Sequence, residues 1–348
     1  MSAQRDSDSV PVSSWRSARL FVTDEFETPP VILRVDDSVI GTLGNFSAST
    51  GKAKSKKTFN VCAIVAAVLT GGTVLNYSAS LPPEKRRILY VDTEQSRFHC
   101  KRVLCRILRL AGLPTDAHPP LLEFLCLHGY ATKERLRKIE EAIYDLDDLG
   151  LVVIDGIRDL AHDINSPGEA TDLITKLMQW TDERRIHIHT VLHLNKGDDN
   201  TRGHLGTELN NKAETVLQIT KDDFDRDVSS VAAMHIRDRD FEPFAFRINA
   251  DALPEPVKGY QFRPTTAAKS FDYAEVCEAK HREALELLFS EADRVSYSSL
   301  IGRLQSSYAA IGHSFGINKA KQLKVFLENK RMIVKEDKFY RYNPEFHY

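Results

Sequence analysis

In residues 87–193, short continuous apolar runs alternate with segments whose apolar positions recur every three or four residues. Short apolar runs predict four strands, at residues 87–92, 121–127, 149–155 and 186–193. Apolar positions three and four residues apart predict the helices between them, at residues 97–110, 132–146 and 168–185. Strands that alternate with helices are typical of a parallel sheet covered by helices. We therefore expect an α/β fold in this part of the chain.

The segments on either side of this alternation predict further strands. Residues 31–35 and 39–46 have the pattern of a hairpin, and a polar loop at residues 48–56 separates them from an apolar helix that ends at a pair of glycines. On the other side, a polar loop at residues 195–206 follows the last strand. Alternating patterns then predict antiparallel strands that extend the sheet, at residues 214–220, 229–237 and 244–248.

The end of the chain has a different pattern. It predicts three helices, at residues 271–290, 296–307 and 318–329, and then a hairpin, at residues 332–335 and 338–342. This order is the order of a winged helix. We therefore divide the chain into a flexible lead-in rich in Ser and Asp, an α/β domain, a Pro-containing linker and a winged-helix domain, at residues 1–25, 26–252, 253–269 and 270–348.

Composition indicates a globular protein with two folded units. The chain has 348 residues, of which 42% are hydrophobic, and this length exceeds that of an average domain. The longest apolar run, residues 61–69, is too short to cross a bilayer, which takes about 20 residues. Residues 1–14 are mostly polar, with Ser, Gln and Asp where a signal peptide would need an apolar stretch. We expect a cytoplasmic protein without a membrane partner.

Charge and cysteine content argue against two kinds of function. A net charge of −2 does not fit a protein that coats nucleic acid with its whole surface, although a local basic region is compatible with it. None of the five cysteines forms a C-x-x-C pair that would hold zinc or act as a redox dithiol. We expect the cysteines to be reduced.

A Lys-rich loop before the first apolar helix is the strongest local feature. Its residues are Gly51, Lys52, Ala53, Lys54, Ser55, Lys56, Lys57 and Thr58. Compared with the phosphate loop G-x-x-x-x-G-K-[ST], it keeps the first Gly, the Lys and the Thr. We expect Lys57 to reach the terminal phosphates of a nucleotide and Thr58 to hold Mg²⁺, with the helix amino terminus adding N–H donors. The alternative is a solvated Lys-rich connection.

Lys56 replaces the second Gly of that motif. Gly adopts a left-handed conformation at no cost, whereas Lys in the same conformation costs roughly 1 kcal/mol. Lys52, Lys54 and Lys56 also add positive charge around the expected phosphates. The replacement therefore raises the question of whether the loop can adopt the backbone conformation of a phosphate loop. The charge of the loop remains suited to binding phosphate.

Carboxylates occur at the ends of two predicted strands. Asp155 ends an apolar strand, at the edge where α/β proteins place ligands, and we expect it to orient Mg²⁺ or its water. The alternative for Asp155 is a helix cap or a turn former. Glu94 lies just past the strand that ends at Asp92, and we expect it to polarise the water that attacks the phosphate. The alternative for Glu94 is a surface residue at a strand terminus.

The order of these features resembles that of a known family. A phosphate loop, Glu94 after the next strand, Asp155 on a later strand and a strand that ends at His193 follow one another over roughly residues 30 to 250. This arrangement is similar to the RecA-like ATPases, in particular the RepA-type plasmid helicases. The resemblance rests on the order and spacing of elements more than on identity. It implies a RecA-like, mainly parallel sheet flanked by helices, with ATP and Mg²⁺ as cofactors.

The resemblance also assigns roles after the fourth strand. In RepA-type helicases, a polar residue at the end of that strand senses the γ-phosphate and leads into a loop that contacts single-stranded DNA. His193 matches the sensor position. Lys196 and Arg202 lie in the segment that matches the DNA-contacting loop, residues 195–206.

Two arginines on a later predicted strand resemble a further feature of such proteins. The segment at residues 235–240 is similar to the paired basic finger of ring helicases and related circadian-clock ATPases, with Arg237 and Arg239 in the two positions. In those proteins the pair projects into the neighbouring subunit's nucleotide. Alternate residues of a strand face the same side, so both guanidinium groups could point at one ligand. This implies a homo-oligomer, as a ring or a filament; the alternative is an exposed strand face with Arg–Asp pairs.

The predicted winged helix is locally basic. Residues 303–341 contain nine basic residues against three acidic ones, an excess that suits contacts with DNA phosphates. We expect the third helix to read duplex DNA and the wing to support it, through residues Asn318, Lys319, Gln322, Lys338 and Tyr340. Winged helices also serve as protein–protein modules, which is the alternative here.

Two functions of the whole chain stay open at this point. The first is an ATP-binding and hydrolysing DNA-handling protein, a RepA-like helicase or loader of a plasmid or mobile element that acts in replication or mobilisation. The second is a nucleotide-sensing, winged-helix, DNA-binding regulator with little ATP turnover. A single-strand recombinase and a defence-system ATPase also fit the motifs. DNA-stimulated ATP turnover separates the first function from the second.

Overall fold

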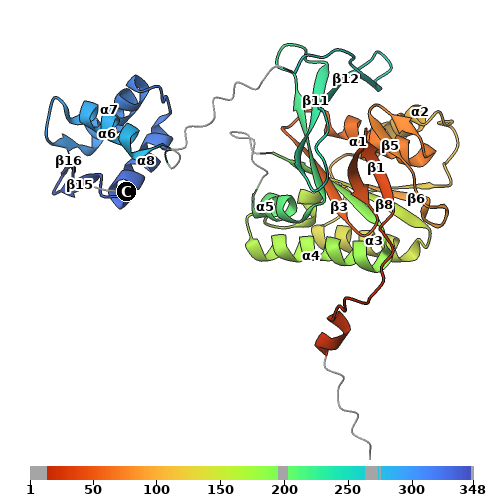
Figure 1. Ribbon diagram of the computed structural model, residues 1–348. Helices are drawn as coiled ribbons and strands as arrows, with labels where there is room; N and C mark the ends of the chain where they lie inside the picture. The colour runs from red at the N-terminus through yellow and green to blue at the C-terminus, as the bar shows by residue number, and fades with distance from the viewer. Residues whose placement is uncertain (1–13, 195–202, 263–272, 274–275, 346–348) are drawn as a thin grey trace, which may run out of the picture. The chain divides into compact units, whose positions relative to one another are not determined.

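The chain folds into two compact units, Met1–Tyr260 and Gln261–Tyr348. The computed structural model describes residues 14–194, 203–262, 273 and 276–345 (Figure 1). The first unit contains the large sheet and the expected phosphate loop, whereas the second contains three helices and a small sheet.

A nine-stranded sheet forms the centre of the first unit, in the order β13-β12-β11-β10-β3-β9-β8-β6-β7. Its parallel part consists of β3 (Phe46–Gly51), β6 (Arg87–Asp92), β7 (Leu122–Cys126), β8 (Leu149–Asp155), β9 (His187–His193) and β10 (Thr215–Lys221). Three antiparallel strands extend it, β11 (Val228–Ile236), β12 (Phe244–Ile248) and β13 (Pro254–Pro256). All six parallel strands end at the same edge, so the residues that follow them lie near one another.

Helices cover both faces of this sheet (Figure 1). One face packs against α1 (Lys57–Thr70) and α2 (Arg97–Leu110), and the other against α3 (Thr132–Asp145), α4 (Pro167–Arg184) and α5 (Gly203–Lys212). No helix in the described part of the chain is both long and apolar enough to cross a bilayer. The expected α/β fold, a mainly parallel sheet flanked by helices, is confirmed.

A second, four-stranded sheet packs beside α1, in the order β2-β1-β5-β4. Its strands are β1 (Val31–Val35), β2 (Ser38–Thr42), β4 (Thr73–Val74) and β5 (Tyr77–Ala79). The hairpin of β1 and β2 follows the prediction, except that β2 ends at Thr42 instead of continuing to residue 46. Strands β4 and β5 were not predicted, because two or three residues are too few to display an alternating pattern.

Strand β3 occupies the middle of the large sheet, although the sequence predicts a loop from residue 48. Its residues after Phe46 are small and mostly polar, and all six residues are buried. The Oγ atom of Ser47 is hydrogen bonded to Nε2 of His187 at 2.7 Å and to Nδ1 of His189 at 2.8 Å, and the Oγ atom of Ser49 to Nε2 of His189 at 2.9 Å. Buried hydroxyls are tolerated when they are paired. The pairing with β9 therefore allows a polar segment to form a central strand.

Three boundaries also differ from the prediction. Helix α5 begins at Gly203, inside the segment that was predicted as a loop. Strand β13 pairs with β12 inside the predicted linker, so the start of that linker belongs to the sheet. The first helix of the second unit begins at Glu278 and not at residue 271.

The second unit packs three helices against a three-stranded sheet. The helices are α6 (Glu278–Phe289), α7 (Tyr297–Ala310) and α8 (Ile317–Asn329). The strands are β14 (Val295–Ser296), β15 (Ile333–Glu336) and β16 (Phe339–Tyr342), in the order β14-β16-β15. Apolar side chains from all three helices fill its core, among them Leu285, Leu300 and Leu323.

Candidate nucleotide site

The loop between β3 and α1 follows the edge of the sheet closely. A Cβ atom on Gly51 would lie 2.3 Å from the carbonyl oxygen of Ile219 and 2.5 Å from Oγ of Ser55, so only glycine fits there. Lys54 and Lys56 have φ angles of 66° and 68°. The backbone at Lys56 therefore has the left-handed conformation that the second Gly of a phosphate loop supplies, with the side-chain penalty of roughly 1 kcal/mol that the sequence indicated.

Lys57 closes this loop on itself. Its Nζ atom donates to the carbonyl oxygens of Gly51 at 2.9 Å and Lys52 at 3.0 Å, and to Nδ1 of His193 at 3.0 Å. Burial lowers the pKa of Lys57 to about 8, although the charges of Asp155 and Glu94 act in the opposite direction. The cation is thus buried and held by two carbonyl oxygens and a ring nitrogen, which phosphate oxygens can replace.

Asp155 is the acceptor of two hydroxyl groups. Thr58 Oγ1 and the Tyr90 hydroxyl both donate to its Oδ2 atom, each at 2.9 Å. Burial, and then the charge of Asp92, raise the pKa of Asp155 to about 6. A buried carboxylate beside a threonine hydroxyl has the oxygen donors that Mg²⁺ prefers. Thr58 and Asp155 therefore fit the group that the phosphate-loop motif implies.

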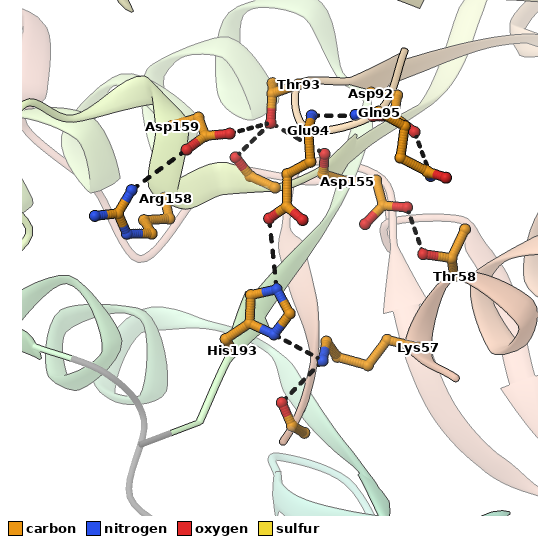
Figure 2. A network of polar contacts seen from close by, with 12 residues as sticks. Lys57, Thr58, Asp92, Thr93, Glu94, Gln95, Asp155, Arg158, Asp159 and His193 are labelled. Carbon is orange, nitrogen blue, oxygen red and sulfur yellow. Dashed lines mark hydrogen bonds and ion pairs between the residues drawn. The ribbon is translucent and has the colours of Figure 1, made fainter. Parts of the chain in front are cut away.

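His193 lies between Lys57 and Glu94, as Figure 2 shows. Its Nε2 atom is 3.5 Å from Oε1 of Glu94, while Nδ1 faces Lys57. Hydrogen bonding to His193, and then the charges of His193 and Lys57, lower the pKa of Glu94 and outweigh the effect of its partial burial. Glu94 is therefore ionised at neutral pH and is positioned from the end of β9.

Asp92 holds the Glu94 turn, a role that the sequence interpretation missed. It is fully buried at the end of β6. Its Oδ1 atom accepts the N–H groups of Glu94 at 3.0 Å and Gln95 at 2.8 Å, and its Oδ2 atom accepts Nε2 of Gln95 at 2.7 Å (Figure 2). An Asp that precedes such a turn by two residues is a known turn former, so the pattern was available in the sequence.

Gly156 allows the ends of β6 and β8 to approach each other. Its φ angle is 105°, and a Cβ atom there would lie 2.2 Å from Oγ1 of Thr93. Thr93 Oγ1 donates to the Gly156 carbonyl oxygen at 2.8 Å. A side chain at position 156 would displace the Thr93–Glu94 turn, so the position of Glu94 depends on this glycine.

A cavity of about 460 Å³ joins these groups. Its lining includes the phosphate loop from Lys54 to Thr58, the carboxylates and His193 described above, and basic residues of α2. A single cavity thus brings together five residues that were predicted from separate parts of the sequence: Lys57, Thr58, Glu94, Asp155 and His193.

Comparison with known protein families identifies the class of this site. The family model described as "AAA domain" matches residues 16–199, which is more than half of the chain and includes every residue named in the preceding paragraph. The chain belongs to the AAA-domain family. The family match and the mainly parallel sheet support a P-loop ATPase fold, and a nucleotide is the class of ligand that this family implies for the cavity.

Among solved structures, this AAA-domain chain is similar to the one titled "Crystal structure of the RadB recombinase". The sequence identity is 15%, the TM-score is 0.43, and the match covers 60% of this chain and 90% of that chain. No curated protein matches the sequence.

The structure does not bring Arg237 and Arg239 near Lys57 of the same chain. Strand β11 ends at Ile236, so both arginines follow the strand and the alternation expected for them does not apply. The end of β11 pairs with the start of β10, at the edge of the sheet opposite the phosphate loop. Nη2 of Arg237 donates there to the Lys212 carbonyl oxygen at 2.9 Å.

The residues predicted to contact DNA differ in how exposed they are, and two of them are not described by the structure. Lys196 and Arg202 lie outside the described residues. In the second unit, Asn318, Gln322 and Lys338 are exposed. Nζ of Lys319 lies 4.9 Å from the centre of the Tyr273 ring, and Tyr340 is 3% exposed and belongs to the core. Tyr340 therefore does not contribute a surface to the wing, contrary to expectation.

Proposed function

We propose that this AAA-domain protein hydrolyses ATP and handles DNA as a RepA-like helicase or loader of a plasmid or mobile element, acting in replication or mobilisation. The observation that carries the proposal is the position of His193 between Lys57 and Glu94. One residue at the end of β9 contacts both the lysine expected at the phosphates and the carboxylate expected at the attacking water. A site that only binds a nucleotide does not require a residue that connects the phosphate-binding lysine with the carboxylate at the attacking water.

The roles of the site residues follow from their contacts. Lys57 would exchange its carbonyl partners for phosphate oxygens, and Thr58 and Asp155 would hold Mg²⁺. When bound, Mg²⁺ neutralises phosphate charge. Glu94 is ionised, so its carboxylate accepts a hydrogen bond from water and orients that water. His193 changes partners when Lys57 moves to the phosphates, and thereby senses the nucleotide.

Contact with a neighbouring subunit completes the proposal. In its own subunit, Arg237 lies at the edge of the sheet opposite Lys57, so any contact of Arg237 or Arg239 with phosphate belongs to a second copy. Guanidinium groups supplied in this way stabilise charge at the γ-phosphate. The active form is accordingly a homo-oligomer, a ring or a filament.

DNA contacts are proposed at two places. The first is the segment at residues 195–206, with Lys196 and Arg202, which follows β9 directly and would contact single-stranded DNA. The second is the C-terminal unit, whose order of three helices and a hairpin is that of a winged helix. Exposed Asn318, Gln322 and Lys338 support duplex contact there, and Lys319 contributes through its place on the same helix.

ATP turnover by the full chain tests this function. We expect Mg²⁺-dependent hydrolysis that single-stranded DNA accelerates, and that Lys57→Ala abolishes. Unwinding of a forked duplex would then separate a helicase from a loader. Nucleotide binding with negligible turnover in the presence of DNA would reject both.

One observation favours the second candidate, a nucleotide-sensing regulator with little turnover. Nζ of Lys56 donates to the Arg226 carbonyl oxygen at 2.8 Å and so ties the phosphate loop to the turn between β10 and β11. A loop held in this way, with a strained residue in place of glycine, resists the rearrangements of a catalytic cycle. Tight binding to one duplex sequence without turnover would support this function.

A further inference from the structure

A second cavity lies against α2, beside the nucleotide cavity. It has a volume of about 240 Å³ and is bounded on one side by α2 and on the other by residues 251–253, which connect β12 to β13. Four basic side chains line it: Lys101, Arg102, Arg106 and Arg109. Asp251 is the one acidic residue among the described residues of its wall.

The basic side chains share one face of α2. Side chains three or four positions apart are neighbours on a helix surface, as are those of Lys101 and Cys105, of Arg102 and Arg106, and of Arg109 with both Cys105 and Arg106. Neither Lys101 nor Arg102 nor Arg109 forms an ion pair with any residue that the structure describes. Like charges on successive turns repel one another. The cavity therefore gathers positive charge that an anion would offset.

Arg106 is fixed in the wall between the two cavities. Its Nε atom donates to the Ala252 carbonyl oxygen at 3.0 Å, and its guanidinium group lies 3.8 Å from the centre of the Phe59 ring. Phe59 is part of α1 and lines the nucleotide cavity, as do Arg102 and Arg106 themselves. Arg102 is not held in this way and lines both cavities, so a ligand that draws it toward one cavity changes the lining of the other.

We propose that the cavity between α2 and the β12–β13 connection binds a compact phosphorylated small molecule and that its occupancy changes the affinity of the nucleotide cavity. Guanidinium and ammonium groups are the side chains that bind phosphate oxygens best. The backbone of residues 251–253 closes the side opposite α2, and the volume is about half that of the nucleotide cavity. Both features favour a compact ligand over a nucleic-acid strand, which carries the same phosphate chemistry.

Calorimetric titration of the full chain with inorganic pyrophosphate tests the proposal, with the nucleotide cavity first saturated with ADP. The double variant Lys101→Ser/Arg109→Ser removes two cations that line the second cavity alone. We expect its Kd for pyrophosphate to rise about tenfold or more, and its ADP affinity without pyrophosphate to stay unchanged. Arg97→Ser is the matched control, because Arg97 is exposed on the same helix and lines neither cavity.

Each other outcome overturns the proposal. Equal pyrophosphate affinity in the wild type and the double variant would place the anion elsewhere. Loss of pyrophosphate binding when ADP is saturating would make this cavity an extension of the nucleotide site. If saturating pyrophosphate leaves the ADP affinity unchanged, the two cavities are not coupled. If the double variant loses binding of a single-stranded oligonucleotide and keeps pyrophosphate binding, the face contacts a strand instead.

Discussion

Nζ of Lys57 donates a hydrogen bond of 3.0 Å to Nδ1 of His193. This contact joins the phosphate loop that follows β3 to the end of the neighbouring strand β9. The opposite ring nitrogen of His193 lies 3.5 Å from Glu94, which follows β6. Three strands thus contribute to a single polar chain, and a change at the phosphates reaches Glu94 through His193.

Removing the His193 side chain should slow the chemical step more than it weakens binding. For His193→Ala we expect ATP turnover to fall about a hundredfold, because Glu94 loses its positioning partner, while the Kd for ATP changes only a few-fold. Single-turnover hydrolysis and equilibrium nucleotide binding measure the two effects. His193→Gln, which keeps a polar group at the same place, should retain more activity; equal losses in both variants would argue against a positioning role.

Asp155→Asn should stabilise the nucleotide-free protein and impair its use of Mg-ATP. The pKa of Asp155 is raised from its ordinary 3.8 to about 6, so ionising it costs the folded state up to about 3 kcal/mol. Below pH 4 Asp155 is protonated in both the folded and the unfolded state, and the folded state does not bear this cost. The corresponding stability of the wild type is lost as the pH rises from about 4 through 6. At pH 7 we expect a higher free energy of unfolding for the variant, measured by denaturant titration. A variant less stable than the wild type at pH 7 would contradict this account.

ATP affinity should fall as the pH rises above 8. In the absence of nucleotide, burial lowers the pKa of Lys57 to about 8, whereas phosphate oxygens in its place would raise it again. Binding above pH 8 therefore takes up a proton, and the Kd should rise by up to about tenfold per pH unit. Titrations in buffers of different ionisation enthalpy would measure the proton uptake. A constant Kd from pH 7 to pH 10 would mean that Lys57 does not meet the phosphates.

Lys56→Gly should stabilise the phosphate loop and speed turnover. Glycine relieves the positive φ angle of 68°, which is worth roughly 1 kcal/mol, and removes the bond to the Arg226 carbonyl oxygen. Lys54→Gly is a matched control, because Lys54 has nearly the same φ angle of 66°. Both variants should gain stability, whereas Lys56→Gly should raise the ATPase rate more than Lys54→Gly does, because it alone removes the bond to the Arg226 carbonyl oxygen. Identical rates in the two variants would remove the special role of Lys56.

The second unit should contact duplex DNA through exposed lysines. Lys321 is exposed on α8, as Lys338 is on the hairpin. For Lys338→Ala and Lys321→Ala, we expect weaker binding to every duplex sequence and a slope of log Kd against log salt concentration that falls by about one ion for each variant. Lys280→Ala is the control, because Lys280 pairs with Glu283 at 2.7 Å. Fluorescence anisotropy over a range of salt concentrations measures the slopes. Unchanged slopes for all three variants would favour a protein partner for this unit.

Most of the parallel sheet could be predicted from the sequence, because its buried strands are apolar runs. Strands β6, β8 and β9 have bounds within a residue of those expected. Strand β3 could not be predicted in this way, because its burial depends on the hydroxyls of Ser47 and Ser49 pairing with histidines from a distant segment. A pattern of apolar and polar positions predicts burial for apolar residues. It does not predict burial for polar residues, because that depends on hydrogen-bond partners elsewhere in the chain.

The same limit applies to the site. The positions of Lys57, Asp155 and Glu94 could be expected, because each begins a helix, ends a strand or closely follows one at the same edge of the sheet. The role of Tyr90 could not, since it depends on a contact with Asp155 on a neighbouring strand, whereas the turn that Asp92 forms is local and its pattern was available in the sequence. The paired alternation expected for Arg237 and Arg239 failed because β11 ends one residue before Arg237.

ATP hydrolysis by the full chain, with and without single-stranded DNA, tests the central claim most directly. We expect wild-type protein to hydrolyse ATP with Mg²⁺, with a rate that DNA increases, and Lys57→Ala to be inactive under both conditions. Lys101→Ala provides a matched control, because it removes a lysine that does not line the nucleotide cavity. Wild-type turnover that equals that of Lys57→Ala, with or without DNA, would contradict the claim that this site is catalytic.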